Sequence, residues 1–367
     1  MLKVLKAILI ILALLVITVV VVIYSINAKN IGEDKLARST AFNGEKFVNL
    51  DENKKAAGDM WKIISAYRGL DTTDHEPTVT IPVEKVTRAH LDALPEDKTH
   101  IVKLGHSSLL IKGSGKYWLV DPVFSERASP FSFMGPKRFH EAPISMDELP
   151  DIEGIIISHN HYDHLDKDAI KTLKVKTNRY FVPLGISGDL ISWGVDQDKI
   201  TEFVWWDTVE HDGLKLTSVP AQHFSGRGVG DSNITLWTAW ALDFEGDKIF
   251  YSGDGGYARE FAEIGSKLGP FDITFMEVGA YNELWPDIHM TPEQAVQAHL
   301  DLNGQYMVPV HNGTFNLAMH TWYEPFDRVL SESDAKNVSL ITPKFGHVIT
   351  LDYKDSYSQD RWWQKLK

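Results

Sequence analysis

The sequence predicts an α/β sandwich in which two sheets lie inside and helices cover them on the outside. Strand-like segments dominate from residue 100 onward, they come in two runs, and helical segments are mixed with them. Such a mixture is typical of layered α/β folds. The clearest strand is "IEGIIIS" at residues 152–158, because continuous β-branched apolar residues suit a strand covered on both faces.

The other predicted strands are short apolar runs bounded by turn-forming residues. Two turns are prominent, "GSGK" at 113–116 and "EGD" at 245–247, and each separates two strands. The strands before and after 152–158 are predicted at 100–112, 117–124, 180–185, 214–223, 234–244, 248–254, 271–279, 306–313 and within 338–352.

Helices are expected where apolar residues recur at helical spacing. In the body of the protein they are predicted at 167–173, 258–264 and 291–302. Asp166 is expected to cap the first of these helices, and Thr291 the last, with Pro292 at its first helical position.

The N-terminal residues predict a membrane anchor. Residues 7–28 contain no charged side chain, and as a helix they would extend about 33 Å, enough to cross a bilayer core of about 30 Å. We favour an uncleaved anchor over a cleaved secretory signal, which has a shorter apolar core and a small-x-small cleavage site. Basic residues flank both ends, so the positive-inside rule barely separates the orientations. We expect the body to lie outside the cytoplasm.

Four parts of the chain follow from these observations. The anchor is succeeded by a juxtamembrane segment at 29–95, a domain at 96–355 that contains the predicted sandwich, and a C-terminal tail at 356–367. The juxtamembrane segment contains an amphipathic helix at 56–70 and a strand-like stretch at 78–86. It either packs on the body as a linker or lies on the membrane surface.

Composition and charge exclude several classes of function. The formal net charge of −13 argues against nucleic-acid binding through a broad basic surface. The chain has no cysteine, which excludes disulfides, thiolate metal sites and a lipid-modified N-terminal Cys. A metal site built from nitrogen and oxygen ligands stays open.

The strongest functional signal is "HNHYDHLD", residues 159–166, directly behind the predicted strand at 152–158. His159 and His161 are two residues apart, so at a strand end both imidazoles point the same way and can reach one metal ion. Asp163 and His164 follow where the chain bends into a helix, and they can face a second ion nearby. Ligands without sulfur suit zinc, with manganese, iron or nickel as alternatives.

Three further strand ends each supply one more ligand. His223, Asp254 and His311 all follow apolar strands, and two glycines after Asp254 permit close backbone approach. A single histidine at a strand end is usually just exposed. Four strand ends that each supply ligands predict a shared metal centre.

At these residues the chain resembles the metallo-β-lactamase superfamily and, more closely, its N-acylphosphatidylethanolamine-hydrolysing phospholipase D family. The most discriminating stretch is "DPVFSERASPFSFMGPKRF", because the superfamily at large lacks it. The segment "HFSGRGVGDSNITLW" departs from that family's pattern, so acyl and head-group preference stay open. The other matching stretches, within residues 100–350, are "LGHSSLLI", "ISHNHYDHLD", "YFVPLG", "SGDGGY", "FDITFMEVGAYN", "HMTPEQAV" and "VPVHNGTF".

The resemblance implies a four-layer αβ/βα sandwich of the metallo-β-lactamase type with two Zn²⁺ ions between the sheets. It also implies hydrolysis of N-acylphosphatidylethanolamine to N-acylethanolamine and phosphatidic acid by a dimetal-activated hydroxide. The implied ligands are His159, His161 and His223 for the first zinc, Asp163, His164 and His311 for the second, and Asp254 as a bridge between them.

Further residues have candidate roles around this centre. His289 matches a substrate-side histidine of the family and is the candidate catalytic general acid, the alternative being a surface histidine beside Thr291. His106 and Asp121 either support ligand imidazoles or serve the fold. The phospholipid substrate requires apolar contacts, for which the candidates are Phe131, Phe133, Met134, Trp285 and Trp322, although the tryptophans could simply be core.

Two other functions compete with the lipid phosphodiesterase. One is a different hydrolase on the same site, such as a lactonase or another phosphodiesterase. The other is a non-catalytic, membrane-anchored metal-binding module, against which the number of ligands argues, because structural sites are closed and usually four-coordinate. The expected partners are a phospholipid and a bilayer, with the oligomeric state left open.

Overall fold

The computed structural model describes residues 6, 10, 11, 31–51, 60–228, 230–353, 356, 357 and 359–367. The predicted anchor at 7–28 lies outside these residues, except for Ile10 and Ile11. None of the helices within the described ranges combines the length and apolar character needed to cross a bilayer.

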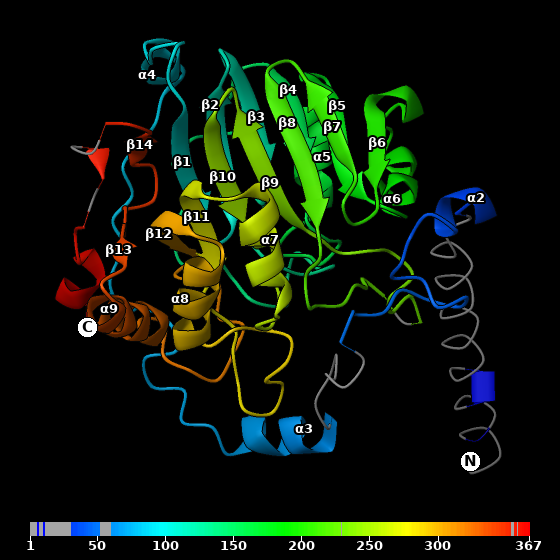
Figure 1. Cartoon of the computed structure of the whole chain (residues 1–367). Coiled ribbons are helices and arrows are strands. Elements are labelled where there is room, and N and C mark those ends of the chain that lie inside the picture. The colour runs from blue at the N-terminus through cyan, green and yellow to red at the C-terminus, as the bar shows by residue number, and fades with distance from the viewer. Residues whose placement is uncertain are drawn as a thin grey trace.

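Two seven-stranded sheets form the body of the protein (Figure 1). The first sheet has the order β14-β1-β2-β3-β4-β5-β6 and the second β13-β12-β11-β10-β9-β8-β7. In chain order the strands are β1 (His100–Gly105), β2 (Ser108–Gly113), β3 (Lys116–Val120), β4 (Ile152–Ile156), β5 (Thr177–Pro183), β6 (Ile200–Phe203), β7 (Thr208–His211), β8 (Leu214–Val219), β9 (Ala239–Phe244), β10 (Asp247–Tyr251), β11 (Phe271–Glu277), β12 (Gly304–Val310), β13 (Ser339–Leu340) and β14 (Val348–Thr350).

Helices cover the outer face of each sheet, so the body has four layers (Figure 1). The helices α5 and α6 pack on the first sheet, and α7, α8 and α9 pack on the second. The described helices are α2 (Glu33–Leu36), α3 (Met60–Arg68), α4 (Arg88–Asp92), α5 (Lys167–Leu173), α6 (Ser187–Ser192), α7 (Glu260–Leu268), α8 (Pro292–Asp301) and α9 (Glu324–Lys336), with short 3₁₀ turns at Gln197–Lys199 and Trp362–Lys365.

Alternation along β3 shows how one strand serves two apolar layers. Trp118 and Val120 point into the core between the sheets, whereas Leu119 points outward into the layer beneath the helices. Successive side chains on a strand face opposite ways, so an entirely apolar strand can fill both layers. The expected sandwich, with two sheets inside and helices outside, is therefore confirmed.

The direction of the strands decides where the polar residues gather. Strands β3, β4, β5 and β6 run parallel in the first sheet, as do β10, β11, β12 and β13 in the second. The carboxyl ends of parallel strands meet at one edge of a sheet, where α/β proteins commonly bind ligands. The segments that follow β3, β4, β10 and β12 therefore meet at one end of the sandwich.

Several elements differ from the prediction. Residues 78–86 do not form the predicted strand, and Val83 makes a single isolated bridge to Phe345. Pro82 disfavours a strand here because it lacks the N–H that a strand ladder needs. The single strand expected at 100–112 is a hairpin of β1 and β2. Its turn at His106 and Ser107 is possible because Gly105 and His106 adopt positive φ values of 147° and 48°. The helix expected within 56–70 is confirmed as α3 over its described part.

The start of α8 agrees with the prediction. Thr291 is the N-cap, Pro292 is the first helical residue, and the Gln294 side chain completes a capping box with Thr291. The Thr291 hydroxyl accepts from the backbone N–H of Gln294, and the Gln294 side chain accepts from that of Thr291. Asp166 likewise caps α5 by accepting from the N–H groups of Asp168 and Ala169.

Replacing Thr291 by Ala should lower the free energy of unfolding by about 1 kcal/mol, because the N–H of Gln294 loses its acceptor. Thr291→Ser keeps the hydroxyl and should remain close to the wild type. Urea denaturation followed by circular dichroism measures both. Equal destabilisation by Ala and Ser would contradict the capping role.

Candidate metal centre

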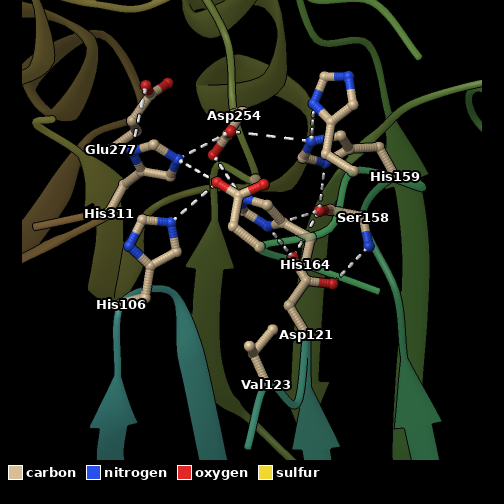
Figure 2. Close-up of polar contacts among 12 residues, drawn as sticks. His106, Asp121, Val123, Ser158, His159, His164, Asp254, Glu277 and His311 are labelled. Carbon is tan, nitrogen blue, oxygen red and sulfur yellow. Dashed lines mark hydrogen bonds and ion pairs between the residues drawn. The ribbon is translucent and has the colours of Figure 1, made fainter. Parts of the chain in front are cut away.

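The seven predicted ligands converge at one end of the sandwich, in two adjoining groups. Figure 2 shows His159, His164, Asp254 and His311 among them. His159, His161, His223 and Asp254 form the first group. In each group the potential ligand atoms lie within 4.8 Å of one another. The second group contains the other three predicted ligands and one further histidine: Asp163, His164, His311 and His106.

The Asp254 carboxylate lies between the two groups and is almost completely buried. Its Oδ1 is 3.0 Å from Nε2 of His164, and its Oδ2 is 3.0 Å from Nε2 of His311. The same Oδ2 is 3.7 Å from Nε2 of His159 and 3.8 Å from Nε2 of His223. One carboxylate therefore faces imidazoles of both groups, which is the position that a bridging ligand requires.

In the first group three imidazole nitrogens point at a common centre. Nε2 of His159 is 2.9 Å from Nδ1 of His161, which is 3.3 Å from Nε2 of His223. Tetrahedral zinc with ordinary Zn–N bonds places its nitrogen ligands about 3.3 Å apart. Burial lowers the pKa of all three histidines, that of His161 to about 4, so the three rings are neutral at pH 7 and present lone pairs to a cation.

The second group carries more charge in the absence of metal. Oδ2 of Asp163 lies 3.2 Å from Nε2 of His311 and 3.7 Å from Nε2 of His164. Burial disfavours a charge on His311, but Asp254 and Asp163 outweigh it and raise the pKa of His311 to about 10. The same balance raises the pKa of His164 well above its usual range. The second group therefore holds imidazolium rings against carboxylates.

The ligand imidazoles are oriented by contacts on their other ring nitrogens. Nδ1 of His164 donates to Oδ2 of Asp121 at 2.7 Å, and Nδ1 of His223 donates to the carbonyl of Ile288 at 3.0 Å. Nδ1 of His159 lies 2.9 Å from the hydroxyl of Ser158. Such partners fix the tautomer so that Nε2 faces the centre.

His106 and Asp121 thus have different positions relative to the centre. Asp121 supports the ring of His164, which is one of the two roles that the sequence left open. His106 contacts no outer ring nitrogen of a ligand; its Nε2 lies 3.1 Å from Asp163, and its ring packs on His311 at 4.1 Å between centroids. His106, Asp121 and His311 all adopt positive φ values, of 48°, 41° and 61°. Strained non-glycine residues of this kind cluster at functional sites.

The residues present fit a pair of divalent cations. Nε2 of His164 and Oδ1 of Asp254 are buried and have no hydrogen-bond partner of good geometry among the described residues. Buried polar atoms of this kind are rare without a ligand. Because the donors are imidazole and carboxylate, the set suits zinc, manganese, iron or nickel.

His289 lies beside the centre, in the segment before α8. Its ring centroid is 5.2 Å from that of His223 and 5.3 Å from that of His311, and the residue is partly exposed. Nδ1 of His289 contacts Oε1 of Glu277 in a short hydrogen bond. The sequence interpretation missed Glu277, although an acidic residue at the end of the apolar strand 271–279 fits the same strand-end pattern as the other ligands.

Arg227 is a second residue that the sequence interpretation missed. Its Nη1 donates to the carbonyls of Asn160 and Leu165, both at 2.7 Å, and its guanidinium lies over the ring of Tyr162. Arg227 therefore fixes the backbone of the ligand loop from outside. A lone arginine in a glycine-rich segment carries no sequence signal for this contact.

The predicted lipid contacts have mixed positions. Phe131, Phe133 and Met134 are exposed in a loop after β3, and the exposed fraction of Phe133 is 77%. Trp285 is partly buried, and its indole N–H donates to the carbonyl of Ala280 at 2.7 Å. Trp322 is instead part of an apolar cluster with Phe326 and the C-terminal tryptophans, and it also lines a narrow pocket beside His311.

Comparisons with known proteins agree with this geometry. The family model of the beta-lactamase superfamily domain matches residues 117–312. An uncharacterized protein of Mycobacterium tuberculosis is 38% identical over 329 residues, 87% of this chain and 86% of that protein. N-acyl-phosphatidylethanolamine-hydrolyzing phospholipase D 1 of Caenorhabditis elegans is 35% identical over 289 residues, 73% of this chain and 80% of that protein.

Among solved structures, the fold is similar to that of Igni18, a metallo hydrolase from the archaeon Ignicoccus hospitalis. The TM-score is 0.55 at 19% identity, over 70% of this chain and 100% of that chain. This likeness establishes the fold alone.

The purified full-length protein should bind about two divalent ions per chain, one for each group of ligands. Asp254→Ala should weaken both sites, because the carboxylate faces both groups. His347→Ala, at a half-buried histidine outside these groups, is the matched control and should keep both ions. Inductively coupled plasma mass spectrometry measures the content. One ion or none in the wild type would contradict the paired centre.

Metal binding should release protons from the second group only. Because the pKa values of His164 and His311 are raised, both rings hold protons near pH 7 that an ion must displace, about two in total. The first group is already neutral. Affinity for one ion should therefore rise with pH, while affinity for the other stays nearly constant between about pH 6 and 8. Isothermal titration calorimetry in buffers of different ionisation enthalpy measures the protons, and two identical, proton-free binding steps would refute this.

Proposed function

Because this chain belongs to the metallo-β-lactamase superfamily and resembles its N-acylphosphatidylethanolamine-hydrolysing phospholipase D members, we propose that it is a phospholipase D-type phosphodiesterase. Its substrate is N-acylphosphatidylethanolamine and its products are N-acylethanolamine and phosphatidic acid. The observation that carries the hydrolytic chemistry is the Asp254 carboxylate between two groups of ligands. The lipid substrate is supported by the similarity to the phospholipase D 1 of Caenorhabditis elegans and by the stretch "DPVFSERASPFSFMGPKRF".

The chain supplies a rigid frame for this chemistry. Two divalent ions, which we assign as zinc, would polarise the phosphate and lower the pKa of the attacking water. Asp254 holds the two groups at a fixed separation, and Asp121 and the carbonyl of Ile288 keep two ligand rings in place. Because most of these side chains are buried, the donors need little rearrangement when the substrate binds.

His289 is the candidate acid for the leaving group. The bond between phosphorus and the ethanolamine oxygen breaks, and that oxygen needs a proton to leave as an alcohol. His289 lies between His223 and His311, one from each ligand group, and its Nδ1 is already occupied by Glu277. Its Nε2 is therefore the nitrogen that can donate the proton.

A bilayer is the proposed partner, with the body held at the membrane by the segment at 7–28 and facing the extracytoplasmic side. The exposed loop with Phe131, Phe133 and Met134 follows β3, whose carboxyl end lies at the metal centre. Figure 1 shows α3 at the same end of the molecule, and Trp61 on this helix is 79% exposed. These apolar side chains support contact with lipid close to the site.

The second candidate is a different hydrolase that uses the same centre, such as a lactonase. It is favoured by the segment at 223–237, which departs from the family pattern and contacts the ligand loop through Arg227. A change beside the centre can alter which ester enters while the ligands stay the same.

The full-length protein in mixed micelles should convert N-acylphosphatidylethanolamine to N-acylethanolamine and phosphatidic acid, detected by mass spectrometry. Asp254→Asn should reduce the rate at least about 100-fold, because it alters the carboxylate shared by both groups. Glu153→Gln, at a buried carboxylate outside the centre, should leave it unchanged. If diacyl phosphodiesters are inert while lactones or cyclic nucleotides are hydrolysed, the lipid assignment fails.

A further inference from the structure

Glu277 is a fully buried carboxylate at the end of β11, next to the metal centre (Figure 2). A buried charge is costly unless hydrogen bonds satisfy it. Oε2 of Glu277 accepts from the N–H of Gly255 at 2.6 Å, and Oε1 accepts from Nδ1 of His289. Each carboxylate oxygen therefore has a donor. One donor belongs to the segment that carries Asp254, and the other is the candidate acid.

The segment that carries His289 is attached to the ligand segments at three points. Nδ1 of His223 donates to the carbonyl of Ile288, and the N–H of Met290 donates to the carbonyl of Gly255 at 3.1 Å. The contact between Glu277 and His289 is the third. Two of the three attachments use backbone carbonyls and fix the position of the segment. Among the described residues, Glu277 is the one that hydrogen-bonds to the imidazole itself and can therefore fix its tautomer.

We propose that Glu277 is a positioning residue for His289. The carboxylate of Glu277 holds the proton on Nδ1 of His289 and thereby directs Nε2 of His289 to the leaving oxygen of the substrate. This inference rests on the proposed function and adds to it the group that orients the acid. A buried carboxylate plays the same part behind the histidine of serine hydrolases, where it fixes the tautomer without taking the proton.

Glu277 assists the hydrolysis of the bond between phosphorus and the ethanolamine oxygen. The oxygen of water forms a bond to phosphorus, and the bond from phosphorus to the ethanolamine oxygen breaks, with its electron pair on that oxygen. Nε2 of His289 gives its proton to this oxygen, and the proton lost by the attacking water restores the imidazolium. Glu277 keeps its hydrogen bond to Nδ1 throughout, and the net reaction consumes one water.

A different role, as a further metal ligand, is less consistent with these contacts. Glu277 belongs to a third group with Asp254, His289 and His311 whose ligand atoms lie within 4.8 Å. Its Oε1 is 3.9 Å from Nδ1 of His311, which is too long for a hydrogen bond, and both oxygens already have closer donors. The metal content of a Glu277 variant separates the two roles.

The first test measures the imidazole directly. Glu277→Gln keeps the shape but leaves one oxygen for two donors, so the N–H of Gly255 and the Nδ1–H of His289 compete for it. In the zinc-loaded full chain labelled with ¹⁵N-histidine, at a pH where the His289 ring is neutral, its Nδ1–H tautomer, which is the form left after the ring has given up its Nε2 proton, should be lost in Glu277→Gln. Glu277→Asp, with both oxygens, should restore it. Glu153→Gln, at a buried carboxylate that pairs with His211 far from the centre, is the matched control. An unchanged His289 tautomer in Glu277→Gln, or no recovery in Glu277→Asp, overturns the proposal.

The second test uses the leaving group. Glu277→Gln should lower kcat for the lipid about 10–100-fold with KM nearly unchanged. Hydrolysis of bis(4-nitrophenyl) phosphate should change little, because nitrophenolate leaves without a proton. His289→Asn should show the same pattern, and the double variant should lose no more than His289→Asn alone, since residues that act as a unit are not additive. Equal losses on both substrates, or additive losses, overturn the proposal.

Metal content and wild-type activity separate the remaining outcomes. Glu277→Gln should still bind about two zinc ions per chain, and loss of an ion would make Glu277 a ligand and overturn the proposal. If the wild type hydrolyses no N-acylphosphatidylethanolamine, the proposed function fails. The tautomer experiment still tests Glu277 in that case, because it needs no substrate.

Discussion

The burial of one carboxylate, that of Asp254, is the constraint on which the metal centre depends. A charge removed from water costs several kcal/mol unless opposite charges and hydrogen bonds surround it. In this chain four imidazoles lie within 3.8 Å of that carboxylate, and they come from the segments after β4, β8 and β12. The rings can converge because β4, β8 and β12 all end at the same edge of the sandwich, although β8 pairs antiparallel with both of its neighbours. The fold therefore serves the centre by bringing distant strand ends together.

The two sheets are also joined by polar contacts close to this edge. The hydroxyl of Tyr251 on β10 donates to Asp121 at 2.6 Å, and the indole N–H of Trp240 donates to the carbonyl of Ile157 at 3.0 Å. The buried ammonium of Lys103 on β1 donates to the carbonyl of Pro309 and to the side chain of Asn312, the residue after His311. Burial lowers the pKa of Lys103 to about 7. Because these contacts cross between the sheets, they oppose a relative sliding of the sheets, which would displace the ligands of one sheet from those of the other.

The sequence predicted the centre better than the elements around it. Histidines and an aspartate at the ends of apolar strands are local signals, and the strands that precede them all end at the same edge, β4, β10 and β12 within parallel pairs and β8 within antiparallel ones. Other features depend on contacts between residues far apart in the chain. They are the hairpin turn at His106, the absence of the strand predicted at 78–86, and the helix α9. For α9, the buried side chains Phe326 and Val329 pack against different apolar clusters, which no local pattern records. Glu277 was missed because an acidic residue at the end of an apolar strand is ordinarily exposed, whereas Glu277 is fully buried.

The contacts of the segment at 223–237 separate metal binding from substrate choice. Arg227 holds the ligand loop through the carbonyls of Asn160 and Leu165, and the N–H of Gly226 donates to the side chain of Asn160 at 2.8 Å. The carboxylate of Asp231 accepts from the N–H groups of Arg227 and Gly228, so the segment is also folded against itself. Each of these contacts pairs a backbone group with a side chain, and within the segment the side chains that take part are those of Arg227 and Asp231. Apart from these two and the ligand His223, the side chains of the segment can differ from those of the family without loss of these contacts, and a new substrate preference requires no new metal geometry.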